Sequence, residues 1–194
     1  MSRHPQGSRG LRLIAGAYKG RRLPGPPDDR IRPTTDRVRE ALFNLLAHRF
    51  RRGAHGLDGV RLLDAFAGTG ALGLEALSRG AEVTFLDTSA EARRLVAAAL
   101  KALEVPPGRA RLLAADALKP PPADAPMEVV LLDPPYGQEL GPPALAALAA
   151  AGWIGPETLA VVEHARPLDA VPGFTIEQSR TFGRSSLTLV VPEG

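Results

Sequence analysis

The stretch Asp64-Ala-Phe-Ala-Gly-Thr-Gly-Ala-Leu-Gly73 lies between an apolar segment and a segment that favours a helix. Its three glycines have the spacing of a nucleotide-type cofactor loop, in which the backbone turns tightly and approaches a ligand at the start of a helix. Asp64 precedes the first glycine by four residues and suits a cofactor with a cationic end, because a carboxylate would repel a pyrophosphate. The loop predicts a cofactor site, and by itself it leaves a nicotinamide cofactor open.

Around this loop, short apolar strands alternate with helices. We expect strands over 60–66, 82–87, 110–115, 127–133 and 158–163, and helices over 71–79, 89–103 and 142–151. This alternation predicts an α/β fold with a parallel, doubly wound, Rossmann-like sheet. Two further strands, 174–181 and 185–191, are expected to form a hairpin that turns at Gly183-Arg184.

The first quarter of the chain is strongly basic. Residues 1–52 contain thirteen Lys and Arg against four Asp and Glu, whereas residues 53–194 contain eleven against seventeen. A basic segment on an acidic body is typical of a domain that follows a phosphate backbone, and a solvated basic tail is the alternative. We expect small strands within 11–23 and a helix that starts at Thr35 or Asp36. The expected organisation is a basic RNA-binding extension over 1–30 and a main domain over 31–194.

Composition excludes several kinds of site. The chain has no cysteine, so it can form no disulfide and no thiolate nucleophile, and its four histidines lack metal-ligand spacing. We therefore expect no metal. No apolar stretch approaches the ~18 residues that a membrane helix needs, and no apolar signal segment follows the first residues. These features predict a cytoplasmic protein without membrane contacts, and nothing in the sequence suggests more than a monomer.

Aspartates also end the next two strands. Asp87 is placed where a carboxylate accepts hydrogen bonds from both hydroxyls of a ribose, and Thr88 follows it at the start of a helix. Asp116 is placed to bind an adenine amine. A simple turn residue is the competing interpretation of each aspartate. The predicted cofactor-binding residues are Asp64, Phe66, Gly68, Gly70, Asp87, Thr88, Asp116 and Ala117.

The most informative motif is Asp133-Pro134-Pro135-Tyr136, which ends the strand over 127–133. The lone pair of an exocyclic base amine is delocalised into the ring. Hydrogen bonds from that amine to Asp133 and to the carbonyl of Pro134 would favour a pyramidal nitrogen that attacks an activated methyl group. Tyr136 would stack on the base and hold it in line. Asp133, Pro134 and Tyr136 are the predicted catalytic residues, and whether Asp133 takes the proton or only polarises the amine stays open.

With these motifs, the chain resembles the class I methyltransferases that use S-adenosylmethionine, and among them the bacterial 16S rRNA guanine-N2 methyltransferases known as the RsmD family. The resemblance rests on 12–16 with 20–23, on RPTTDRVRE at 32–40 followed by ALFN at 41–44, on the glycine loop and on the Asp-Pro-Pro-Tyr motif. It implies seven strands with the last antiparallel, an rRNA-binding N-terminal β-hairpin, and methylation of a guanine of the 966 type in the small (30S) ribosomal subunit. The implied RNA contacts are Arg12, Lys19, Arg21, Arg22, Arg32, Arg37 and Arg39.

Other functions fit parts of this pattern. The Asp-Pro-Pro-Tyr motif serves any planar amine, so adenine N6 in RNA or DNA and a protein glutamine amide are alternative acceptors. The basic extension argues against a protein acceptor, and the lack of a separate target-recognition domain argues against DNA. A non-catalytic ribosome assembly factor is a further alternative, against which the intact Asp133 and Tyr136 argue. A nicotinamide-dependent oxidoreductase would leave the Asp-Pro-Pro-Tyr motif unexplained.

Overall fold

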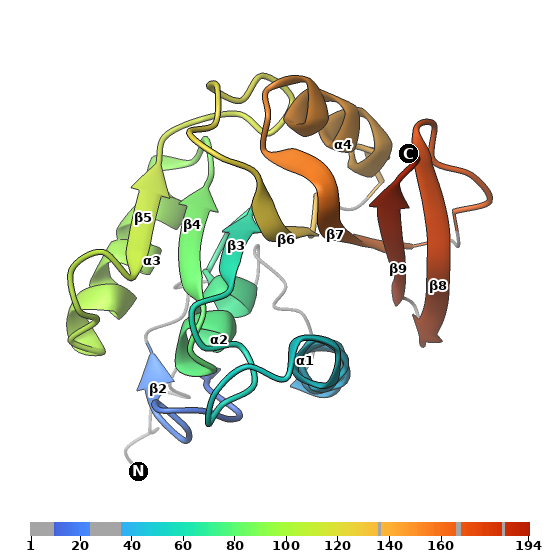
Figure 1. The fold of residues 1–194 in the computed structure, drawn as a ribbon. Helices are drawn as coiled ribbons and strands as arrows, with labels where there is room; N and C mark the ends of the chain where they lie inside the picture. Colours follow the sequence, from blue (N-terminus) through green and yellow to red (C-terminus); the bar gives the residue numbers. More distant parts are fainter. Residues whose placement is uncertain (1–9, 24–35, 136, 166–167, 184) are drawn as a thin grey trace, which may run out of the picture.

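A seven-stranded mixed sheet forms the centre of the protein, in the order β5-β4-β3-β6-β7-β9-β8 (Figure 1). The computed structural model describes residues 10–23, 36–135, 137–165, 168–183 and 185–194. The strands are β1 (Leu11–Arg12), β2 (Arg22–Leu23), β3 (Arg61–Asp64), β4 (Glu82–Leu86), β5 (Ala110–Leu113), β6 (Met127–Leu132), β7 (Ile154–His164), β8 (Phe174–Phe182) and β9 (Ser185–Pro192). The helices are α1 (Asp36–Phe50), α2 (Ala71–Ser78), α3 (Ala90–Ala102) and α4 (Gly141–Ala150). None of these described helices is long and apolar enough to span a membrane.

The strand directions confirm the predicted fold. The five strands from β5 to β7 run parallel, and β9 runs antiparallel to both of its neighbours, β7 and β8. This is a Rossmann-like sheet whose last strand is antiparallel. Strand β7 begins four residues earlier than expected, because Ile154 pairs with Met127 ahead of a bulge that contains Pro156, and proline is tolerated at a bulge since it donates no ladder hydrogen bond.

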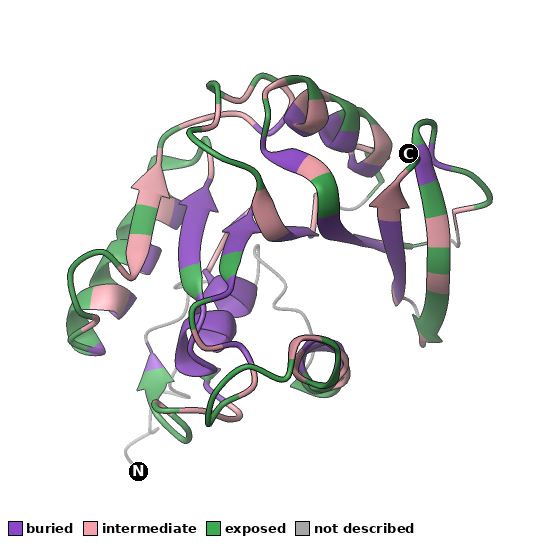
Figure 2. Ribbon diagram, in the orientation of Figure 1, coloured by how far each residue is buried: buried purple, intermediate pink, exposed green. Residues whose placement is uncertain are grey.

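Two hydrophobic clusters cover the two faces of the sheet. On one face, the leucines of the β1–β2 hairpin pack with α1, α2 and α3. On the other face, α4 packs with Trp153 and with the strand residues that point to that face. Figure 2 shows the central strands and α2 as buried, and the outer faces of α3 and β8 as largely exposed. The hairpin therefore shares a core with the main sheet.

Helix α2 is buried along its whole length. Its Gly73 lies against the ring of Phe85 in β4, and a Cβ at this position would come 2.2 Å from Phe85 Cε1. Only glycine lets the helix pack this closely on the strand. The position of α2 is thus fixed by contact with the sheet.

The N-terminal hairpin is bound to the second half of α2. The backbone N–H groups of Ile14 and Ala15 donate to the carboxylate of Glu75, at 2.8 and 3.1 Å. The N–H of Tyr18 donates to the hydroxyl of Ser78 at 3.0 Å. Since the hairpin backbone is anchored at two points of α2, it is a fixed part of the fold.

Buried Arg39 corrects one expectation from the sequence. Its side chain donates to the carbonyl of Arg12 at 2.7 Å and to Asp36 at 2.9 Å, and its Nε lies 3.9 Å from Glu75. Arg79 donates to Glu75 as well, at 3.0 Å. Arg39 has no exposed surface, so it ties α1 to the hairpin and to α2. The expectation that it contacts RNA is wrong.

We expect Glu75→Gln to lower the free energy of unfolding by about 3 kcal/mol, because removing one member of a buried ion pair leaves the remaining charges uncompensated. Here the charges that lose a buried partner are Arg79 and Arg39, and Arg39 keeps only its pairing with the exposed Asp36. The matched control is Glu82→Gln, at an exposed residue of β4, for which we expect a change within about 0.5 kcal/mol. Chemical denaturation measures both, and equal stability of the two variants would contradict the role of Glu75.

Candidate cofactor and catalytic site

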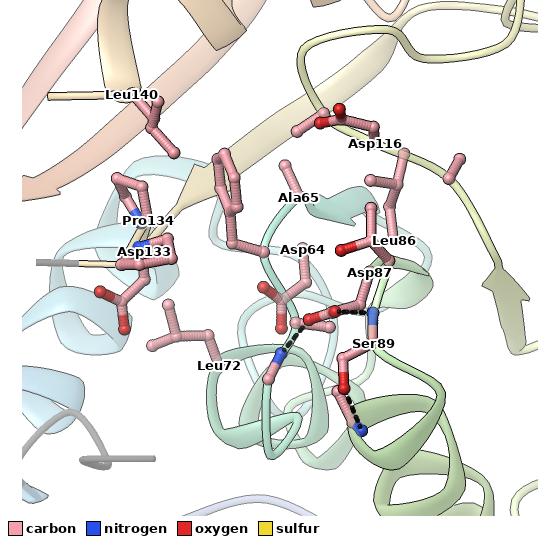
Figure 3. Close-up of a pocket in the computed structure, with 18 of the residues that line it drawn as sticks. Asp64, Ala65, Leu72, Leu86, Asp87, Ser89, Asp116, Asp133, Pro134 and Leu140 are labelled. Carbon is pink, nitrogen blue, oxygen red and sulfur yellow. Dashed lines mark hydrogen bonds between the residues drawn. The ribbon is translucent and has the colours of Figure 1, made fainter. Parts of the chain in front are cut away.

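A cavity of about 750 Å³ opens at the carboxyl ends of β3, β4, β5 and β6 (Figure 3). Its size is typical of small-molecule sites, and its place at this edge is where open α/β sheets bind ligands. The lining residues are Asp64 to Thr69, Ala71, Leu72, Leu86 to Ser89, Glu91, Ala92, Ala115 to Leu118, Asp133 to Pro135, Gln138 and Leu140.

Two aspartates hold the glycine loop in place. Asp64, at the end of β3, accepts a hydrogen bond from the N–H of Gly73 at 2.8 Å. Asp87, just after β4, accepts from the N–H of Gly68 at 2.8 Å and from that of Ser89 at 2.7 Å (Figure 3). The carboxylates fix both ends of the loop, so the backbone at the cavity is ordered before a ligand arrives.

Burial shifts the pKa of Asp64 well above its ordinary value. Its removal from water raises the pKa of its carboxyl group to about 7, although the hydrogen bond from Gly73 opposes the rise; the charge of Asp87 adds to it. A neutral carboxylic acid and a carboxylate are therefore both populated near neutral pH. A cation bound beside Asp64 would favour the charged form.

Every charged residue described in the cavity lining is acidic. Asp64, Asp87, Glu91, Asp116 and Asp133 contribute carboxyl groups, and none of the described lining residues is Lys, Arg or His. At short range, like charges repel strongly in a site that is partly closed to water. The arrangement therefore favours a cationic ligand and disfavours one with a pyrophosphate.

The structure brings most of the predicted cofactor residues together. Asp64, Phe66, Gly68, Asp87, Thr88, Asp116 and Ala117 all line the cavity. Gly70 is not among the lining residues: it has a φ of 79° at the start of α2, and a Cβ there would lie 2.9 Å from Val96. It therefore serves the turn and the packing. Asp116 accepts from the N–H of Leu118 at 2.9 Å, which shapes the loop after β5.

The predicted catalytic motif lies at the same cavity. Asp133 and Pro134 line it, together with Leu72 of α2 (Figure 3). Tyr136 lies outside the described residues. The apolar wall formed by Leu72, Leu86 and Leu140 was missed by sequence reasoning, because leucines in such elements have the pattern of core residues.

None of the other predicted RNA contacts that the structure describes is among the residues lining the cavity. Arg12, Lys19, Arg21 and Arg22 are exposed on the hairpin, and Arg37 is exposed in the first turn of α1; Arg32 lies outside the described residues. Arg21 donates to the carbonyl of Ala102 at 2.7 Å and so caps the end of α3. The hairpin is bound at the end of α2 opposite the glycine loop, and an eight-residue helix is about 12 Å long.

Comparison with known proteins places the chain in a family. A family model described as Conserved hypothetical protein 95 matches residues 11–191. The ribosomal RNA small subunit methyltransferase D of Haemophilus influenzae is 35% identical, over 92% of this chain and 92% of its own length. The chain belongs to this family. The methyltransferase D of Escherichia coli is 38% identical, over 81% of this chain and 76% of its own length.

A solved structure with a similar sequence also has a similar fold. A putative methyltransferase from Escherichia coli is 32% identical, with a TM-score of 0.79 over 95% of this chain and 98% of that one. The match to the family model begins at Leu11, so it includes the hairpin as well as the sheet. The hairpin that is bound to α2 is thus part of what this chain shares with the family.

We expect Asp64→Asn to change how stability depends on pH. Because the pKa of the folded state lies above the ordinary 3.8, the folded protein holds this proton more tightly, and stability from this group is lost as pH rises toward 7 at about 1.4 kcal/mol per pH unit. The variant should match the native protein near pH 3.5, below both pKa values, and exceed it at pH 8. Denaturation at both values tests this, and parallel profiles would contradict it.

Proposed function

We propose that the chain transfers the methyl group of S-adenosylmethionine to the exocyclic N2 amine of a guanine of the 966 type in 16S rRNA of the small ribosomal subunit. The observation that carries this proposal is a cavity in which all the charged residues described in its lining are carboxylates, with Asp133 and Pro134 at its edge. The relatives named ribosomal RNA small subunit methyltransferase D support the choice of substrate.

The acidic lining favours S-adenosylmethionine over a dinucleotide. The cofactor carries a sulfonium and an ammonium group, whereas a nicotinamide dinucleotide brings a pyrophosphate that five carboxyl groups would repel. Asp87 would accept from the ribose hydroxyls, and Asp116 with Ala117 would border the adenine. Asp64, whose charged form a cation favours, would face the ammonium end. When bound, the cofactor supplies a methyl group that is already activated toward a nucleophile.

The residues after β6 would prepare the amine for attack. The carboxylate of Asp133 and the carbonyl of Pro134 would accept hydrogen bonds from the NH2 group and draw its lone pair out of conjugation. Leu72 and Leu140 line the same cavity (Figure 3) and would keep water from competing for these acceptors. Stacking by Tyr136 stays a prediction from the sequence.

The basic extension over 1–30 would supply the RNA contacts. Lys19 and Arg22 are exposed on the hairpin, and Arg37 is exposed on α1. Cations on the hairpin would bind phosphates roughly one α2 length from the cavity, so the RNA would be held at a distance from the reacting base. Because the hairpin is fixed on α2, that distance is set by the fold.

The proposal is tested by transfer of a labelled methyl group to undermodified 30S subunits, protein-free 16S rRNA and DNA, followed by nucleoside analysis. We expect N2-methylguanosine from subunits or rRNA. N6-methyladenine as the product would move the acceptor to another base. Binding of the cofactor without transfer to any of the three acceptors would contradict the proposal.

We expect Asp133→Ala to lower kcat by about 10²–10³-fold, the usual effect of removing one group that stabilises developing charge. The dissociation constant for S-adenosylmethionine should stay within about twofold, because Asp133 would contact the base. The control is Asp169→Ala, at an exposed residue outside the cavity lining. Single-turnover transfer and calorimetry measure the two quantities. Retained turnover would remove Asp133 from the reaction.

We expect Arg22→Ala to weaken RNA binding and to reduce the salt slope of the binding constant by about one, as for loss of a single phosphate contact. Arg21→Ala should in addition lower the melting temperature, since it removes the cap that Arg21 places on α3. Binding titrations at several salt concentrations, with thermal unfolding of both variants, separate the two effects. An unchanged slope for Arg22→Ala would place the RNA elsewhere.

A further inference from the structure

Arg93, in the first turn of α3, binds the backbone that follows β4. Its Nη1 donates to the carbonyl of Asp87 at 3.0 Å and to that of Thr88 at 2.7 Å. Arg93 is half-buried and is not among the residues that line the cavity, whereas both of its partners are. The transfer proposed above gives this arginine no role, although it holds part of the cavity wall.

The loop that Arg93 binds carries the aspartate proposed to hold the ribose. Asp87, Thr88 and Ser89 all line the cavity. The carboxylate of Asp87 also accepts from the N–H of Gly68 at 2.8 Å and from that of Ser89 at 2.7 Å (Figure 3). A displacement of the backbone at Asp87 would therefore move the carboxylate and loosen the glycine loop as well.

The carbonyls of Asp87 and Thr88 lie beyond the end of the strand and take their hydrogen bonds from Arg93. Strand β4 ends at Leu86, and outside the helices and strands no backbone N–H of the described residues donates to either carbonyl. Each carbonyl belongs to a planar peptide unit, and Thr88 supplies the two dihedral angles between the units. Because one nitrogen binds both carbonyls, it restricts these angles and so fixes the course of the backbone at Asp87.

The first turn of α3 gives Arg93 a fixed starting point. Its backbone N–H donates to the carbonyl of Ser89 at 3.1 Å, and the hydroxyl of Ser89 accepts from the N–H of Ala92 at 3.2 Å as the cap of the helix. A guanidinium is a charged donor, and it binds a carbonyl more strongly than a neutral donor does. A loop that is ordered in this way before a ligand arrives loses less entropy on binding, which raises the affinity.

We propose that Arg93 is a positioning residue for the cofactor: it holds the carbonyls of Asp87 and Thr88 and so presets the Asp87 carboxylate for the ribose of S-adenosylmethionine. The inference rests on the proposed function. It adds to that function a residue that acts through Asp87 and does not touch the ligand.

The test measures the dissociation constant for S-adenosylmethionine by calorimetry. The variants are Arg93→Ala, Arg93→Lys, Asp87→Ala and the double variant of Asp87→Ala with Arg93→Ala. The matched control is Arg94→Ala, because Arg94 is the exposed neighbour of Arg93 on the same helix. Thermal unfolding checks that each protein is folded at the temperature of the titration.

Arg93→Ala should raise the dissociation constant about tenfold, the size of one or two net hydrogen bonds, whereas Arg94→Ala should change it by less than about twofold. Arg93→Lys keeps a charged group with N–H donors and should recover most of the affinity. In the Asp87→Ala background, Arg93→Ala should cost less than about twofold, because two residues that act as a unit are not additive.

Equal losses from Arg93→Ala with and without Asp87 would overturn the inference, because Arg93 would then act independently of the aspartate. An unchanged dissociation constant in Arg93→Ala would overturn it too, as would a loss in Arg93→Lys that equals the loss in Arg93→Ala. If Asp87→Ala binds too weakly to measure, the alanine and lysine variants of Arg93 still decide. A native protein that binds no S-adenosylmethionine would instead refute the proposed function, and the inference with it.

Discussion

The fixed position of helix α2 is the constraint on which the site depends. Asp64 binds the first turn of the helix through Gly73, and Glu75 binds the hairpin backbone while it pairs with Arg39 and Arg79. The helix therefore carries the cofactor loop at one end and the basic hairpin at the other. A shift of α2 would move both, and the proposed distance between methyl donor and RNA contacts follows from its length.

The charge of the cavity lining then decides which ligands the site can bind. The glycine loop has the turn and spacing of a dinucleotide site, but the carboxylates around it would repel a pyrophosphate. Two of them, Asp64 and Asp87, also hold the loop through its backbone N–H groups. The same side chains thus order the backbone of the loop and favour a ligand that carries positive charge. A cationic methyl donor fits both properties, which is why fold and proposed chemistry agree.

The sequence predicts the position of residues that directly follow a strand, because the carboxyl ends of parallel strands meet at one edge of the sheet. Asp87 and Asp133 were found because the alternation of strands and helices puts such residues at one sheet edge. Arg39 was misjudged, since its partner Glu75 is far away in the sequence and a helix arginine has the pattern of a solvated residue. Contacts between distant elements leave no local pattern, and the position of Arg39 depends on such contacts.

A crystal structure of the protein with S-adenosylmethionine would show directly whether the acidic cavity holds a cationic methyl donor against the Asp-Pro-Pro-Tyr edge. We expect the ribose on Asp87, the adenine beside Asp116, and the methyl carbon directed at the space next to Asp133 and Pro134. A cofactor bound outside this cavity, or one whose methyl group points away from Asp133, would contradict the proposed site and its chemistry.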